Sequence, residues 1–263
     1  MKRRSFRLLL VVATVGCTAA GMHATVESPV RAESGAAVSL SASVRGRRAV
    51  GPVSPEDAAG RVELSAREAP SLRRRPGTVR AEIIQRREGT YIDELLLARD
   101  SALVRWPERL RQPLLVWIQP TSQVEDFDRR FVQKARSAFS EWSATGIPVE
   151  FAFVTDSVDA DVRVTWVGRF AEPVSGKTLW ARDGRWWMVD ASILLATHHS
   201  SGDPLDESAI HALALHEVGH LLGLDHTADA SNIMTPRVRV RELSTADRAT
   251  ARLLYSLPPG PVR

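Results

Sequence analysis

The chain has 263 residues, of which 44% are hydrophobic and 25% are charged, and its formal net charge is +4. This composition excludes collagen-like, wholly disordered and multi-span membrane proteins. The single cysteine, Cys17, excludes a disulfide framework within the chain and any cysteine-based zinc or iron–sulfur site. Residues 1–77 carry a net charge of +7 and residues 78–263 a net charge of −3. Because the chain beyond residue 77 is mildly acidic, no nucleic-acid partner is expected.

Residues 1–24 have the layout of a secretory signal peptide. Basic residues between Lys2 and Arg7 precede an apolar run over 8–15, and small residues follow at 16–20. Cleavage after Ala20 would place the mature chain outside the cytoplasm. Segment 14–17 also resembles a bacterial lipobox, so lipid attachment at Cys17 is an alternative and the only association with a membrane that we expect. We therefore predict a secreted or extracytoplasmic protein.

Two segments precede the predicted main domain. Residues 25–77 are rich in Ala, Ser, Arg, Pro and Gly and contain no aromatic residue, so we predict a disordered tether. Residues 78–111 carry apolar residues on both sides of Gly89, and we predict a partly helical extension that packs outside the main domain. The main domain is expected over residues 112–258.

Apolar patterns in the main domain predict strands and helices in alternation. A strand over 113–118 is followed by a helix from 126 or 128 to about 145, and by strands over 149–154 and 161–167. The Asp-Gly pair at 183–184 predicts a two-residue turn between strands over 178–182 and 185–193. A helix from 206 or 207 to 222 is apolar almost all round and is therefore predicted to be buried.

Three polar residues, His216, Glu217 and His220, interrupt this buried helix, and buried polar groups are costly unless they are satisfied. The two histidines lie within about 40° of each other on one helix face, so both can reach one metal ion. Glu217 is offset and can lean over that ion. Gly223 ends the helix, and His226 can then return to the ion as a third ligand. Three neutral histidines leave a fourth position open for water, which is typical of catalytic zinc.

These residues resemble a known family. Segment 216–226, with the pattern HExxHxxGxxH, resembles the zinc signature of the metzincin peptidases and most closely that of the matrixins. Segment 232–236 resembles the Met-turn of that family, and segment 243–255 resembles its last helix. The resemblance covers roughly residues 113–255. It implies an α/β fold with a twisted, mixed five-stranded sheet, an antiparallel edge strand, a zinc-binding active-site helix and a C-terminal helix.

The resemblance also implies an activity and a site. The chain would be a zinc metalloendopeptidase that hydrolyses proteins or peptides with a zinc-activated water, and the substrate would lie as an extra strand along residues 178–181. Arg237 and Val238 would border the pocket for the residue after the cut. The resemblance implies that His216, His220 and His226 bind zinc. Glu217 would be the general base, and Met234 would form the apolar floor under the zinc.

The chain departs from the family in two respects, and two other functions remain open. Cys17 lies in the leader, so the cysteine switch with which the family blocks its zinc is not available. Ala246-Asp247 stand where the family has paired acids, and Asp247 can still anchor the Met-turn. A gluzincin-type peptidase would need a downstream Glu ligand in place of His226. A non-catalytic zinc-binding envelope or adhesion protein would have no use for Glu217. We expect a monomer.

Overall fold

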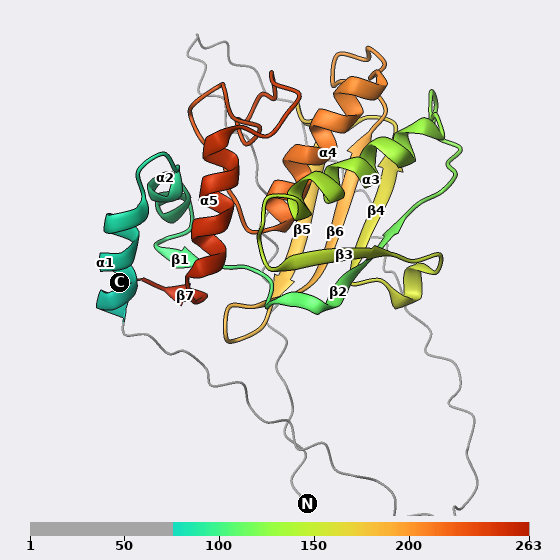
Figure 1. Ribbon diagram of the computed structural model, residues 1–263. Helices are drawn as coiled ribbons and strands as arrows, with labels where there is room; N and C mark the ends of the chain where they lie inside the picture. The colour runs from blue at the N-terminus through green and yellow to red at the C-terminus, as the bar shows by residue number, and fades with distance from the viewer. Residues whose placement is uncertain (1–75, 263) are drawn as a thin grey trace, which may run out of the picture. The chain divides into compact units, whose positions relative to one another are not determined.

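The computed structural model describes residues 76–262, so the predicted signal peptide, Cys17 and most of the predicted tether lie outside the described residues. A five-stranded sheet has the strand order β3-β2-β4-β6-β5 (Figure 1). Four strands are parallel: β2 (Arg109–Ile118), β3 (Val149–Phe153), β4 (Val162–Val167) and β6 (Met188–Ala196). The edge strand β5 (Gly176–Arg182) is antiparallel to β6. The predicted mixed sheet with one antiparallel edge strand is confirmed.

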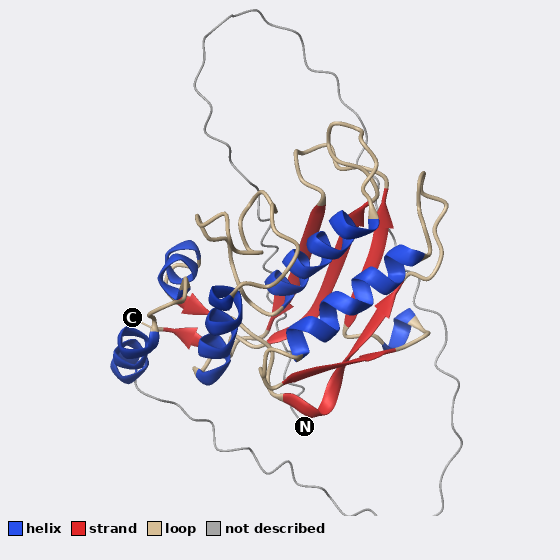
Figure 2. Cartoon of the chain, turned by 45° about the horizontal axis from the view of Figure 1, so that its top comes forward, coloured by secondary structure: helices blue, strands red, loops and turns tan. Residues whose placement is uncertain are grey.

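Two long helices, α3 (Arg130–Ser143) and α4 (Glu207–Leu221), lie on the same face of the sheet (Figure 2). In α3, apolar residues at helical spacing form one buried face that includes Phe131, Ala135, Phe139 and Trp142. Helix α4 contacts α3, β5 and β6, and this explains why most of its residues are buried. The contacts with β5 place the polar residues of α4 beside the edge of the sheet.

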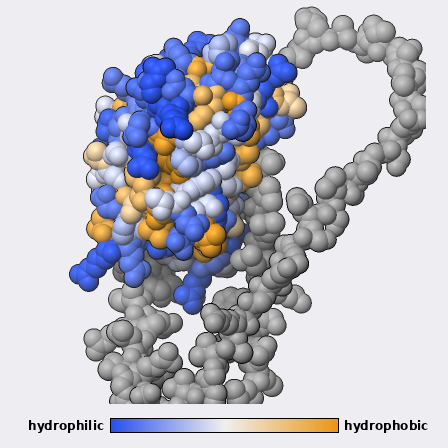
Figure 3. Space-filling view, turned by 90° about the vertical axis from the view of Figure 1, so that its right-hand side faces the viewer, coloured by the Kyte–Doolittle hydropathy of each residue, from blue (hydrophilic) through white to orange (hydrophobic). Residues whose placement is uncertain are grey.

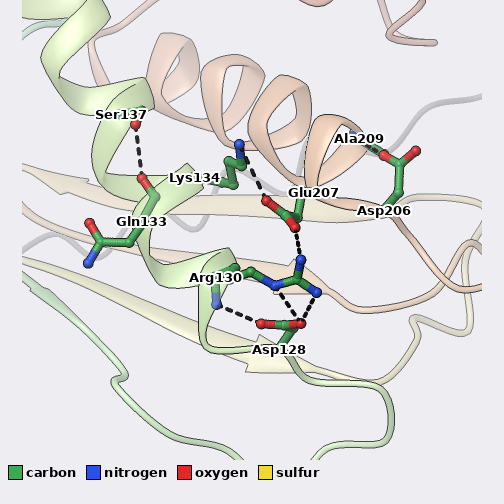
Figure 4. Close-up of polar contacts among 8 residues, drawn as sticks. All are labelled: Asp128, Arg130, Gln133, Lys134, Ser137, Asp206, Glu207 and Ala209. Atoms are coloured by element: carbon green, nitrogen blue, oxygen red, sulfur yellow. Dashed lines mark hydrogen bonds and ion pairs between the residues drawn. The ribbon is translucent and has the colours of Figure 1, made fainter.

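Charged side chains join the first turns of the two helices (Figure 4). Asp206 caps α4 by accepting a hydrogen bond from the backbone N–H of Ala209 at 2.7 Å. Glu207 pairs with Arg130 of α3 at 2.5 Å and with Lys134 at 3.4 Å. These pairs link the start of α4 to α3, but they are partly exposed and therefore add little stability.

The segments that precede β2 and follow α4 in the sequence form a second group of elements. It comprises α1 (Pro76–Arg86), α2 (Ile92–Ala98), α5 (Thr245–Ser256) and a small antiparallel sheet of β1 (Ala102–Leu103) and β7 (Gly260–Pro261) (Figure 1). Segment 78–111 was expected to pack outside the main domain. Instead Ile92, Leu95 and Trp106 are fully buried and join the main hydrophobic core. Residues 76 and 77, placed in the tether by the sequence, begin α1.

Two strand boundaries also differ from the expectation. Strand β2 begins at Arg109, four residues before the predicted start. The turn after β5 is not a two-residue Asp-Gly turn, because residues 183–187 separate β5 from β6. The Asp183 carboxylate accepts hydrogen bonds from the backbone N–H groups of Arg185 and Trp187, both at 2.9 Å, and this closes a wider loop. A short 3₁₀ helix, η2 (Ser157–Asp159), precedes β4.

Exposed hydrophobic residues are spread over several elements. On the face seen in Figure 3, hydrophobic residues lie in separate areas between hydrophilic ones. The large exposed side chains come from different parts of the chain: Ile84, Leu97, Leu110, Val158 and Val189. Single exposed hydrophobic residues of this kind are normal in folded proteins. Within residues 76–262, no helix has the length and hydrophobicity needed to cross a membrane.

Candidate active site

Helix α4 and the loop after it bring three histidines together. The Nε2 atoms of His216 and His220, one turn apart on α4, are 3.1 Å from each other. Gly223 has a φ of +100° and turns the chain back. The Nε2 atom of His226 then lies 3.2 Å from that of His220 and 3.3 Å from that of His216. The described residues contain no other cluster of three or more potential metal ligands.

The other nitrogen of two of these rings is held by the backbone. Nδ1 of His216 lies 2.8 Å from the carbonyl oxygen of Ile233, and Nδ1 of His220 lies 3.1 Å from that of Leu224. A carbonyl only accepts hydrogen bonds, so Nδ1 carries the hydrogen in each ring and Nε2 presents a lone pair. The lone pairs of these two rings therefore point toward a common position.

This arrangement fits a zinc ion. Tetrahedral zinc with Zn–N bonds of about 2.0–2.1 Å requires ligand nitrogens about 3.3–3.4 Å apart, and the three observed separations are close to that value. Burial lowers the pKa of His216 to about 4, and it also lowers the pKa values of His220 and His226. The imidazoles are thus neutral at neutral pH, which is the form that binds a metal.

Glu217 lies on the side of α4 that faces β5. One carboxylate oxygen, Oε2, accepts a hydrogen bond of 2.5 Å from the hydroxyl of Thr178. The other, Oε1, lies against Gly176, where a Cβ atom would overlap it. Burial raises the pKa of Glu217 to about 7, while the Thr178 hydrogen bond acts in the opposite direction. Strand β5 therefore leaves space for this carboxylate and orients it beside the three imidazoles.

Met234 is fully buried and packs against α4. Its sulfur is packed against Gly219, which lies between His216 and His220 on α4. The loop that carries Met234 is fixed by Asp247 of α5, whose Oδ2 accepts hydrogen bonds from the backbone N–H groups of Ile233 at 2.9 Å and Ser244 at 2.8 Å. Asp247 therefore anchors this loop with one carboxylate, without a second acid.

A cleft of about 620 Å³ opens beside the three imidazoles and Glu217. Residues 172–179 line one side and residues 236–238 with Arg241 line another. The apolar side chains of the lining are Val174, Leu205, Ala209, Leu213 and Val238. The charged side chains of the lining, which we call the rim, are Glu172, Lys177, Arg237 and Arg241. Glu172 and Lys177 pair with each other at 2.9 Å. Neither Arg237 nor Arg241 forms an ion pair with another described residue.

The remaining described histidines lie elsewhere. His211 pairs with Glu141 of α3 at 2.7 Å, away from the cluster. His199 is exposed. His198 is not, because its ring lies between the hydroxyl of Thr197 and the carboxylate of Asp126, each at 3.0 Å.

Sequence reasoning had not assigned a role to Gly176 or to the Thr178 hydroxyl. Both act on Glu217 across a sequence separation of about 40 residues. Their contact depends on the register between β5 and α4, and no local pattern encodes that register. The available signal was that Gly176 lies two residues before the predicted strand over 178–182, along which the substrate was expected to bind.

Comparison with known proteins agrees with this geometry. The matrixin family model matches residues 169–256, which include β5, β6, α4 and α5. Metalloendoproteinase 1-MMP of Arabidopsis thaliana is 31% identical over 137 residues, which cover 47% of this chain and 37% of the plant protein. Metalloendoproteinase 1 of Glycine max is 26% identical over 152 residues, which cover 50% of this chain and 48% of the plant protein. The chain thus spans less than half of the length of each relative.

Proposed function

We propose that this chain, a matrixin-like metzincin, is a zinc-dependent endopeptidase in which Glu217 is the general base. The observation that carries the proposal is the carboxylate of Glu217, which is buried beside three converging imidazoles, opens to a cleft and is not needed to complete the cluster. The names of both plant relatives support the same activity.

The proposed ligands are His216, His220 and His226. When bound, Zn²⁺ supplies Lewis acidity that makes water a better acid and polarises the peptide carbonyl. Glu217 takes the proton that the attacking water loses as the C–O bond forms. It then transfers that proton to the amine nitrogen as the C–N bond breaks. The Thr178 hydroxyl keeps the carboxylate turned toward the cleft during both transfers.

The edge of β5 is the proposed binding site for the substrate backbone. Among the described residues, β5 pairs with β6 on one side and with no strand on the other. Its free edge lines the cleft over residues 176–179. An extended peptide can add to such an edge through main-chain hydrogen bonds and insert alternate side chains into pockets. Binding of this kind favours internal segments of unfolded or flexible protein substrates.

The charged rim of the cleft suggests a substrate preference. Arg237 and Arg241 are exposed at the rim and have no acidic partner among the described residues. A carboxylate of the substrate would be attracted to these two arginines, whereas a lysine of the substrate would be repelled. Each exposed pair contributes about 0.2–1 kcal/mol, so we expect acidic residues near the cut to raise kcat/KM by up to about fivefold per arginine.

A peptide library with defined ends tests the proposal. We expect the full chain to cut internal bonds, with acidic residues enriched near the cut, and we expect Arg241→Glu to weaken that enrichment. Arg182→Glu is the matched control, because Arg182 lies on β5 but does not line the cleft. Release of single residues from the ends would contradict an endopeptidase. An unchanged preference in both variants would contradict the role of the rim.

The alternatives are less well supported. A gluzincin would use a carboxylate as the third ligand, whereas the grouping of His226 with His216 and His220, without a carboxylate among the described residues, favours His226. A zinc-binding protein without activity does not explain why strand β5 makes room for a buried carboxylate at Gly176. Secretion rests on the sequence of residues 1–24, and the lipid anchor at Cys17 and the monomeric state stay predictions.

A further inference from the structure

The segment from Tyr91 to Arg99, which contains α2, contacts the chain around each of the three histidines. It lies outside the region that matches the matrixin model and outside the main domain expected from the sequence. It is joined to the cluster near His220 by Arg99. Arg99 donates to the carbonyl oxygen of Leu224 at 3.0 Å, and that oxygen also accepts from Nδ1 of His220. Arg99 pairs with Asp225 at 2.9 Å as well, and both side chains are largely buried.

A second contact lies next to His226. The carboxylate of Glu94 accepts hydrogen bonds from the Thr227 hydroxyl at 3.0 Å and from the backbone N–H of Ala228 at 2.7 Å. Both donors belong to the two residues that follow His226. Asp225, held by Arg99, accepts from the backbone N–H of His226 itself at 2.8 Å. The peptide that carries the third histidine is therefore fixed on both sides by the 91–99 segment.

The third contact leads to His216 through two steps. The Tyr91 hydroxyl donates to Oδ1 of Asp247 at 3.0 Å, while Oδ2 of Asp247 accepts from the N–H of Ile233. The carbonyl oxygen of Ile233 then accepts from Nδ1 of His216. Tyr91 and Asp247 are both buried, so water does not replace these hydrogen bonds.

We propose that the 91–99 segment is a positioning element of the metal centre, which holds the three imidazoles in the arrangement that binds a metal ion. Partners of the far nitrogen of a metal-ligating histidine set its tautomer and orientation, and their loss typically weakens metal binding by about 10–100-fold. The inference rests on the metal centre proposed above but not on peptide hydrolysis, so metal affinity is the measurement that tests it.

The test compares two acidic residues of the same helix in the full chain. Glu94→Ala removes the carboxylate that holds residues 227 and 228. Asp93→Ala removes an exposed carboxylate that pairs, among the described residues, only with the exposed Arg87. Both changes remove the same charge. We expect the Zn²⁺ dissociation constant, measured by competition with a chelating dye, to rise about 10–100-fold for Glu94→Ala. It should change little for Asp93→Ala.

Two further readouts separate positioning from general loss of stability. The visible absorption of bound Co²⁺ should change in Glu94→Ala, and Glu94→Gln, which keeps an acceptor oxygen, should recover much of the affinity. If Glu94→Ala does not fold, Tyr91→Phe removes a single hydroxyl, with Tyr255→Phe of α5 as control. Equal zinc affinity in Glu94→Ala and Asp93→Ala, or in the two tyrosine variants, would overturn the inference. A wild-type chain that binds zinc but cleaves nothing would overturn the proposed activity alone.

Discussion

Glu217→Gln is expected to lower the rate of peptide hydrolysis by about 10²–10⁴-fold, the usual contribution of a general base. Glutamine has the same shape as glutamate and can still accept the hydrogen bond from Thr178. Its amide cannot take a proton from water. Because Glu217 is not part of the cluster of imidazoles, zinc content should stay at the wild-type level. Cleavage of a fluorogenic peptide and zinc content, measured on the same preparations, check both expectations.

Two variants make this result specific. Glu172→Gln removes a carboxylate at the rim of the same cleft, exposed and paired with Lys177, and we expect nearly wild-type hydrolysis from it. Glu217→Asp keeps the charge but withdraws it from the water, so we expect an impaired rate. Wild-type activity in Glu217→Gln would remove Glu217 from the mechanism.

His226→Ala is expected to weaken zinc binding by about 2.5–4 kcal/mol, or about 10²–10³-fold. This figure divides the approximately 10–16 kcal/mol of a structural zinc site among its four ligands. Loss of the His226 ring leaves His216 and His220 as a two-ligand site on α4. Zinc affinity by competition with a chelating dye is the measurement, and circular dichroism of the metal-free protein shows whether the fold is retained.

The matched control for His226→Ala is His211→Ala. His211 belongs to α4, but its ring pairs with Glu141 of α3 and lies outside the cluster of imidazoles. We expect its zinc affinity to equal that of the wild type. If His226→Ala instead binds zinc as tightly as His211→Ala, a carboxylate is the third ligand and the gluzincin alternative gains support.

The part of the site that sequence predicts well is the part that local geometry determines. The four-residue spacing of His216 and His220 places both rings on one face of any α-helix, whatever surrounds it. Gly223 indicates the reversal that returns His226. The order of strands and helices followed from apolar periodicity, and the resemblance to the matrixins supplied the topology of the sheet.

The part that sequence missed depends on contacts between distant segments. Tyr91 and Asp247 are separated by 156 residues, and Glu94 and Ala228 by 134. Such pairs leave no periodic signal in a single chain. The apolar stretch around Ile92 was expected to pack outside the main domain, yet Ile92 is fully buried and α2 contacts α5.

The prediction of a two-residue turn between β5 and β6 was wrong for a different reason. An Asp-Gly pair favours a two-residue turn, but the Asp183 side chain here bonds the backbone of Arg185 and Trp187. A side chain that satisfies two backbone N–H groups stabilises a wider loop. The Arg182 guanidinium also stacks on the Trp186 ring at 3.8 Å, a contact that a tight turn could not provide.

Titration of the metal-free chain with Zn²⁺, with peptide cleavage recorded at each addition, tests whether zinc and Glu217 together carry peptide hydrolysis. We expect the wild-type rate to rise in proportion to bound zinc and to level off at one equivalent per chain, while Glu217→Gln binds the same zinc with almost no rise in rate. Cleavage by the metal-free chain would contradict a zinc-dependent mechanism. So would a fully loaded wild-type chain without activity, and a Glu217→Gln curve that follows that of the wild type would contradict the role of Glu217.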